Sequence, residues 1–192
     1  MSGSSSAVHA TVTEFGYRAV MRVIGVTLAT ISLVLAGCAA SPESAPPSSD
    51  PSALRALVLV DVRTGAEFTL GQLAAERPVL LETMAIWCTN CRGQQRQVVD
   101  AHDLADFESV SLDVDPNERP DDLADYADRE GFDWRFAVAD GDMVQLLRGQ
   151  FGSAVLNPPS MPKILFRTDG SVELIGLGEL LGAAELAAIL GG

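Results

Sequence analysis

The segment WCTNC at positions 87–91 holds two thiols, Cys88 and Cys91, at a spacing that lets them close into a disulfide and open again. An apolar run, Pro-Val-Leu-Leu at 78–81, precedes it and predicts a buried strand. A more polar stretch, 92–102, follows it and predicts a helix. The two cysteines therefore lie where a strand passes into a helix.

This position favours redox chemistry at Cys88. The first turn of a helix has unpaired backbone N–H groups and the positive end of the helix dipole, and both stabilise a thiolate. Such sites lower a cysteine pKa from about 8.5 into the range of roughly 3.5 to 7.5. We expect Cys88 to be the nucleophile that forms a mixed disulfide with a substrate, and Cys91, one helical turn further on, to resolve it.

Composition limits the class of protein. The sequence has 192 residues, of which 47% are hydrophobic, so it can bury one sizeable core and we expect one folded domain. It has 26 Asp and Glu against 13 Lys and Arg, for a net charge of −13. Because such a chain repels phosphate backbones, nucleic acid is not expected as a partner.

The first 37 residues have the pattern of a secretory signal peptide. Arg18 and Arg22 precede an uncharged apolar stretch, 23–35, that is too short to span a bilayer but suits a signal peptide. The stretch ends in Leu-Ala-Gly-Cys at 35–38, which resembles the bacterial lipobox. That resemblance implies cleavage before Cys38 and lipidation of its sulfur. Met21 is an alternative start, because residues 21–37 already make a complete signal peptide.

Residues 38–53 predict a flexible tether, because they are rich in Pro, Ser and Ala, and residues 54–192 predict the folded domain. Lipidation of Cys38 would leave Cys88 and Cys91 as the remaining pair of cysteines. We expect this pair to lie in an oxidising, extracytoplasmic compartment. A fixed stabilising disulfide is the alternative, although so small a loop removes little chain entropy. We expect no metal site, because zinc would need two more ligands than the cysteine pair supplies.

The order of predicted elements indicates an α/β fold with a mixed sheet. A small hairpin opens the domain, and a hairpin and a helix close it. The predicted strands are 57–62, 68–70, 79–84, 110–114, 136–139, 164–166 and 172–175. The predicted helices are the turn 71–75, then 88–105, 120–130, 143–148 and 183–190.

The stretch from about 68 to 190 resembles the thioredoxin superfamily, and within it the membrane-tethered TlpA-like branch. Trp87, Cys88 and Cys91 match the redox motif of that family, with Thr89 and Asn90 as its variable dipeptide. Two further stretches match, in the correct order. They are Met-Pro followed by Ile-Leu-Phe at 161–166, which resembles the cis-proline loop and terminal hairpin, and the helix and strand predicted within 113–140, which resemble the TlpA-type insertion.

The resemblance implies roles for residues outside the cysteine motif. Pro162 would be the cis-proline, and the backbone of Met161 would pair with an extended substrate beside Cys88. Trp87 is expected to pack on the site and shield it, with ligand binding as the alternative. Thr89 and Asn90 would contact the substrate. Two alternatives stay open for Glu82, six residues before Cys88: a buried acid that moves a proton to or from Cys91, or an exposed strand residue. Lys163 departs from the family pattern, which usually has Thr after the cis-proline.

Two other functions compete. The stretch 113–119 followed by Trp134 resembles the SCO copper chaperones, which bind copper through two cysteines and a distant histidine. This chain spaces its cysteines by two residues rather than three and has no histidine after His102, so the third ligand is missing. The second competitor is a lipoprotein that only binds a partner and keeps Cys88 and Cys91 locked in a disulfide.

The function that the sequence favours is an extracytoplasmic, lipid-anchored thiol:disulfide oxidoreductase. By resemblance to TlpA-like proteins of cytochrome c maturation we expect a reductase, acting on exported proteins that contain cysteines. Its electrons would come from a membrane thiol donor, because no motif for a nicotinamide or a flavin is present and the redox-active disulfide is the only expected cofactor. We expect a monomer held at the membrane through Cys38.

Overall fold

The computed structural model describes residues 51–191, so the predicted signal peptide, the lipobox cysteine Cys38 and most of the predicted tether lie outside the described residues. The strands are β1 (Val58–Val60), β2 (Glu67–Thr69), β3 (Val79–Met84), β4 (Glu108–Asp113), β5 (Arg135–Val138), β6 (Lys163–Phe166) and β7 (Val172–Gly176). The helices are α1 (Pro51–Ala56), α2 (Leu70–Leu73), α3 (Thr89–His102), α4 (Pro120–Glu130), α5 (Gly141–Phe151) and α6 (Ala183–Leu190), and η1 (Ser153–Leu156) and η2 (Pro158–Ser160) are 3-10 turns.

A five-stranded mixed sheet forms the centre, in the order β5-β4-β3-β6-β7, and β1 and β2 make a separate antiparallel hairpin. β3 pairs in parallel with β4 and β4 with β5, while β6 runs antiparallel to β3 and β7 antiparallel to β6. All six residues of β3 are buried, as a central strand covered on both faces requires. Parallel neighbours need long crossovers, which α3 and α4 supply.

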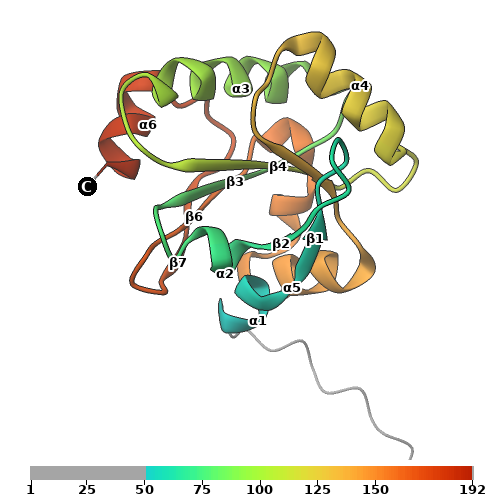
Figure 1. Ribbon diagram of the computed structural model, residues 1–192, viewed down its shortest axis with the longest axis horizontal. Helices are drawn as coiled ribbons and strands as arrows, with labels where there is room; N and C mark the ends of the chain where they lie inside the picture. The colour runs from blue at the N-terminus through green and yellow to red at the C-terminus, as the bar shows by residue number, and fades with distance from the viewer. Residues whose placement is uncertain (1–50, 192) are drawn as a thin grey trace, which may run out of the picture. The chain divides into compact units, whose positions relative to one another are not determined.

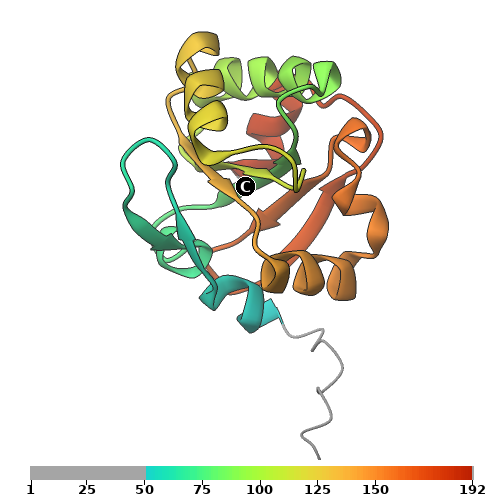
Figure 2. The same cartoon turned by 90° about the vertical axis from the view of Figure 1, so that its right-hand side faces the viewer.

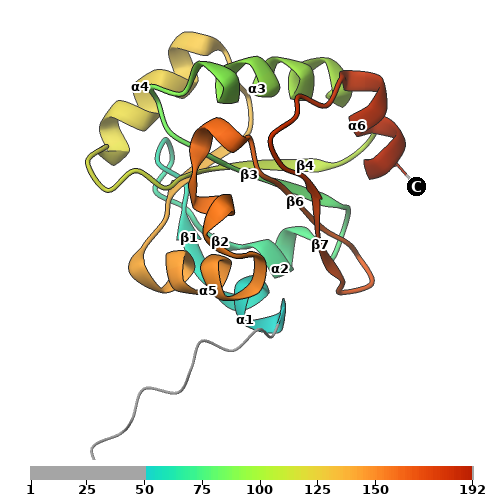
Figure 3. The ribbon, with the colours of Figure 1, turned by 180° about the vertical axis from the view of Figure 1, so that it is seen from behind.

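Helices cover both faces of the sheet: α3, α4 and α6 lie on one face, and α1, α2 and α5 lie on the other (Figures 1 and 3). The hairpin β1–β2 stands at the β5 edge, where β1 contacts β5 (Figure 2). Each face has its own core. On β3, Leu80 and Met84 pack into the core beneath α3, and Val79 and Leu81 into the opposite core, as the two-residue repeat of a strand dictates.

The face beneath α3 also buries polar side chains. Gln95 of α3 donates to the hydroxyl of Ser111 on β4 over 3.0 Å, and the indole N–H of Trp134 donates to the same hydroxyl over 3.0 Å. Tyr126 of α4 donates to the amide oxygen of Gln95 over 2.6 Å. Because each of these groups has a partner, the polar layer avoids the cost of leaving a buried donor or acceptor unpaired.

The structure confirms the predicted α/β class, the opening hairpin, and the helix and strand between 113 and 140, which are α4 and β5. The helix after the cysteines is shorter than predicted, because it starts at Thr89 and ends at His102. The sequence analysis did not predict α1, which begins at Pro51 and is held through buried Leu54. No helix within 51–191 has the length and apolar composition needed to cross a membrane.

Candidate active site

Cys88 is the N-cap residue of α3, the position predicted for the nucleophile. Its Sγ accepts the N–H of Cys91 over 3.1 Å, and the two sulfurs are joined in a disulfide whose Cα atoms are 5.3 Å apart. Cys88 is 2% exposed and Cys91 4%. The N–H that contacts Cys88 Sγ in the disulfide would also stabilise a thiolate there after reduction.

The loop before β6 faces the second cysteine. Cys91 Sγ lies 3.1 Å from the carbonyl oxygen of Pro158, so the reduced thiol of Cys91 can donate a hydrogen bond to that carbonyl. Met161 donates its own N–H to the same oxygen over 2.8 Å, and it adopts a left-handed backbone conformation, with a φ of 45°. Both Met161 and Pro162 are buried. The structure therefore brings 158–162 and the cysteine pair together.

The other predicted contact residues surround the cysteines at the surface. Trp87 is 57% exposed, and its indole N–H donates to Asp115 Oδ2 over 2.7 Å. Thr89 and Asn90 are exposed at the start of α3, and Asn90 reaches the carbonyl of Pro159 over 3.5 Å. These side chains lie where an approaching protein would meet them, and the substrate contacts of Thr89 and Asn90 stay a prediction.

Glu82 is buried, which answers the question that the sequence left open about its environment. Its side chain is 5% exposed, and Oε2 is buried without a hydrogen-bond partner. A cavity of about 10 Å³, room for roughly one water, is lined by Glu82, Cys91 and Pro162 among others. Burial raises the pKa of Glu82 to about 8, and the positive charge of Lys163 opposes part of that rise.

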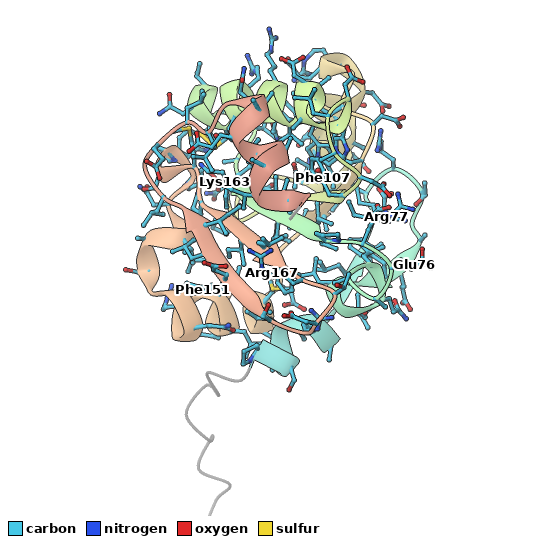
Figure 4. The ribbon with its side chains drawn as sticks, turned by 90° about the vertical axis from the view of Figure 1, so that its left-hand side faces the viewer. Glu76, Arg77, Phe107, Phe151, Lys163 and Arg167 are labelled. Carbon is cyan, nitrogen blue, oxygen red and sulfur yellow. A yellow bond between two sulfur atoms is a disulfide. The ribbon has the colours of Figure 1, made fainter. Side chains whose placement is uncertain are left out.

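Lys163 is the strand partner of Glu82 and the only lysine of the chain. It is fully buried, and its ammonium donates to the carbonyl oxygens of Met161 and Glu179, each over 2.7 Å. Figure 4 shows Lys163 on β6, beneath the helical layer. Burial lowers the pKa of Lys163, while the charge of Glu82 counteracts that effect. Its place next to the predicted cis-proline makes it part of the site.

Gly176 on β7 makes room for this lysine. It is the strand partner of Lys163, and a Cβ at Gly176 would lie 2.5 Å from Lys163 Cε. Any larger residue at 176 would push the ammonium away from its two carbonyl partners. The sequence showed Lys163 as a departure from the family pattern, but only the strand register reveals why it is tolerated.

The lysine also engages the carbonyl that a substrate would need. The N–H of Met161 donates to Pro158 and its carbonyl accepts from Lys163, so both backbone groups of Met161 have partners within the chain. Backbone pairing between Met161 and a substrate stays a prediction, and it would require a second acceptor site on this carbonyl or an opening of these bonds.

Gln94 is a structural part of the site that its sequence context does not reveal. Its amide group makes two hydrogen bonds to the backbone of Leu181, donating over 3.0 Å and accepting over 2.8 Å. These bonds hold the segment between β7 and α6 against the first turns of α3. Because they join residues 87 positions apart, no local sequence pattern indicates them.

His102 does not approach the cysteine pair. It ends α3, so the rise of the helix separates it from Cys88 by about 20 Å. Its ring stacks on Phe107 and lies 2.9 Å from the hydroxyl of Ser109. Within residues 51–191 no three His, Cys, Asp or Glu side chains are grouped as ligands for a metal ion. A copper site at Cys88 and Cys91 would need its third ligand from elsewhere.

The five-stranded sheet, with the disulfide at the start of the helix that follows its central strand, is a thioredoxin-like fold. A thiol:disulfide interchange protein of the thioredoxin family from Chlorobium tepidum TLS superposes with a TM-score of 0.55 at 17% identity, over 70% of this chain and 90% of that one. A secreted disulfide oxidoreductase of Mycobacterium tuberculosis, homologous to E. coli DsbE, gives 0.54 at 16% identity, over 72% and 96%.

BsSco, of the Sco family of cytochrome c oxidase assembly proteins, gives a TM-score of 0.54 at 17% identity, over 70% of this chain and 88% of that one. Comparison with protein-family models and with curated protein sequences finds no match. At these identities the likeness establishes the fold. The chemistry must be argued from the cysteine pair and the groups around it.

The raised pKa of Glu82 makes protein stability depend on pH. Between about pH 4.5 and pH 8 the unfolded chain loses the Glu82 proton while the folded chain keeps it, so this group makes unfolding more favourable as pH rises. We expect Glu82→Gln to match the wild type near pH 4.5 and to exceed it at pH 8 by a few kcal/mol, since one pKa unit corresponds to about 1.4 kcal/mol.

Denaturant unfolding of both proteins at several pH values measures this difference. Glu76→Gln, at an exposed position, is the matched control and should show no such trend. A difference between Glu82→Gln and wild type that stays constant from pH 4.5 to 8 would contradict the raised pKa.

Proposed function

We propose that this chain is a thiol:disulfide oxidoreductase that exchanges disulfides with cysteine-containing proteins through Cys88 and Cys91. The observation that carries the proposal is the disulfide at the start of α3, with Cys88 as N-cap, Cys91 facing the 158–162 loop and a buried acid behind it. A stabilising disulfide needs no such acid. The likeness to thiol:disulfide oxidoreductases of the same fold supports the proposal.

In the reducing direction the exchange has two steps. The Cys88 thiolate attacks a substrate disulfide, which forms a Cys88–substrate disulfide and releases one substrate thiolate. The Cys91 thiolate then attacks the sulfur of Cys88, which closes the Cys88–Cys91 disulfide and releases the second substrate thiolate. Two electrons pass to the substrate in total, and its two released thiolates then take up protons from the solvent.

Glu82 is proposed as the base for the second step. Its carboxylate can take the proton of the Cys91 thiol through the small cavity that both residues line, and a pKa of about 8 suits a group that binds and releases a proton near neutral pH.

Replacement of Glu82 by Gln should slow resolution of the mixed disulfide without changing the first step. Equal resolution rates across neutral pH would remove Glu82 from the mechanism.

The direction of exchange is proposed to be reduction of exported proteins. Support comes from the resemblance of the motif-bearing segments to the TlpA-like branch, whose members include reductases of cytochrome c maturation. The reduced pair must be regenerated, and a membrane protein that passes electrons through thiols would do so. No organic cofactor is required, because the disulfide itself carries the two electrons.

Location at the outer face of the cell membrane is proposed from the lipobox at 35–38, which lies outside the described residues. A diacylated Cys38 would supply the two acyl chains that stable anchoring needs.

We expect the full chain to fractionate with membranes. We expect the Cys38→Ser variant to carry no lipid and either to be released or to remain an uncleaved precursor. Intact-mass measurement of the purified proteins checks this, and an unlipidated wild-type Cys38 would contradict it.

A trapping experiment tests the oxidoreductase proposal. In Cys91→Ser the first step proceeds but the mixed disulfide is not resolved, so Cys88 should remain bonded to its substrates. Non-reducing gels followed by reduction and mass spectrometry identify the trapped proteins. Cys88→Ser is the matched control and should trap far less. If Cys91→Ser traps nothing and the wild-type disulfide resists mild reductant, the chain is a binding lipoprotein with a locked disulfide.

A further inference from the structure

Two residues that precede the nucleophile are held by the loop that follows β4. The backbone N–H of Ile86 donates to both carboxylate oxygens of Glu118, over 3.0 and 2.8 Å. The indole N–H of Trp87 donates to Asp115 over 2.7 Å. Acids of this loop therefore fix the backbone and the side chain immediately before Cys88.

A third acid, Asp113, lies behind these two. It ends β4 and is fully buried, and its Oδ1 accepts the N–H of Asp115 over 2.9 Å. Its Oδ2 is buried and has no donor for a charged carboxylate to accept from. Asp113 also lies within hydrogen-bonding reach of the Glu118 side chain. A proton on Asp113 resolves the conflict, because the carboxylic acid can then donate to Glu118.

Among residues 51–191, no positively charged group compensates a charge on Asp113. The charges that act on it are those of Asp115 and Glu118, both negative. On β3, the carbonyl of Met84 accepts the N–H of the residue after Asp113. On the other side, the N–H of Ala139, which follows β5, donates to the Asp113 carbonyl. The next acid along the chain, Asp140, caps α5 through the N–H of Met143 over 2.8 Å.

We propose that protonated Asp113 is a positioning residue for thiol exchange: it donates to Glu118 and thereby keeps Ile86 and Trp87 in place beside Cys88. Asp113, Asp115 and Glu118 are called the Asp113 cluster below. The inference rests on the proposed function, since it concerns the readiness of the same cysteine for exchange. It adds a second buried acid, separate from Glu82, that acts through the loop before the nucleophile.

The arrangement depends on pH. Burial raises the pKa of Asp113 to about 7, and the negative charges of Glu118 and Asp115 add to that rise, while the N–H of Asp115 opposes it. Asp113 therefore gains and loses its proton near neutral pH, next to the negative charge of Glu118. Loss of that proton places two like charges side by side and removes the donor, so the hold of Glu118 on the Ile86 N–H weakens.

The indole signal of Trp87 reports this change without requiring catalysis. The full chain contains two tryptophans, so a nitrogen-15 spectrum has two indole signals, and Trp87→Phe assigns the one that matters. The protein is kept in the disulfide form, in which neither Cys88 nor Cys91 titrates. We expect the Trp87 signal to move with a midpoint near pH 7, and we expect the same midpoint in Glu82→Gln.

Asp113→Asn is the decisive variant, because an amide at this position donates to Glu118 at every pH. Its Trp87 signal should keep the low-pH position from pH 5 to 9. The thiol-exchange rate of this variant, divided by that of the wild type, should also be several-fold higher at pH 8.5 than at pH 6. Asp142→Asn, at an exposed position of α5, is the matched control and should titrate like the wild type.

If Asp113→Asn does not fold, Glu118→Gln gives the same test in another way. The loss of the Glu118 charge should move the midpoint of the Trp87 signal to lower pH, because that charge raises the pKa of Asp113. A Trp87 signal that does not move in wild type, or that moves equally in Asp113→Asn, overturns the inference while leaving thiol exchange intact. Absence of exchange with a titrating indole would instead reject the proposed function.

Discussion

The burial of Glu82 opposite Lys163 is the constraint on which the rest of the site depends. The two residues are partners on adjacent antiparallel strands, and both are enclosed on the face of the sheet that α3 covers. Each would be costly to bury alone as a charged group. The lysine meets this cost with two backbone carbonyls, whereas Glu82 meets it by keeping its proton to about pH 8.

Lys163 and Gln94 connect parts of the chain that are far apart in sequence. The ammonium of Lys163 joins the carbonyl before Pro162 to the carbonyl of Glu179, while Gln94 fixes the neighbouring segment to α3 through Leu181. The cysteine pair thus lies between an internal acid and a set of loops held by hydrogen bonds. A change in the protonation of Glu82 or Lys163 can therefore alter, through these bonds, the position of the loops beside Cys88.

The sequence was sufficient for the fold because its elements follow local rules. The apolar strand 79–84, the thiols at a helix start and the hairpin around Gly170 each have a pattern that does not depend on the rest of the chain. The short helix α1 lacks such a pattern: its six residues are too few to show a periodic apolar face, and the burial of Leu54 becomes visible only in the tertiary structure.

The site was predictable only in its motif residues. Whether Glu82 faces solvent or the core depends on α3 lying across β3, and the fit of Lys163 depends on a glycine at its strand partner. The contacts of the Asp113 cluster with Ile86 and Trp87 require the ends of β3 and β4 to be adjacent. Such facts follow from strand order and register, which local sequence patterns do not encode.

A redox titration of the Cys88–Cys91 pair shows whether this disulfide is a reversible redox couple. The full chain is equilibrated with thiol and disulfide buffers of graded potential, and the reduced fraction is read by alkylation and intact mass. We expect reversible two-electron behaviour with a potential near that of thioredoxin, about −270 mV. A pair that stays oxidised below about −300 mV would be a structural disulfide, and this result would contradict a role in thiol exchange.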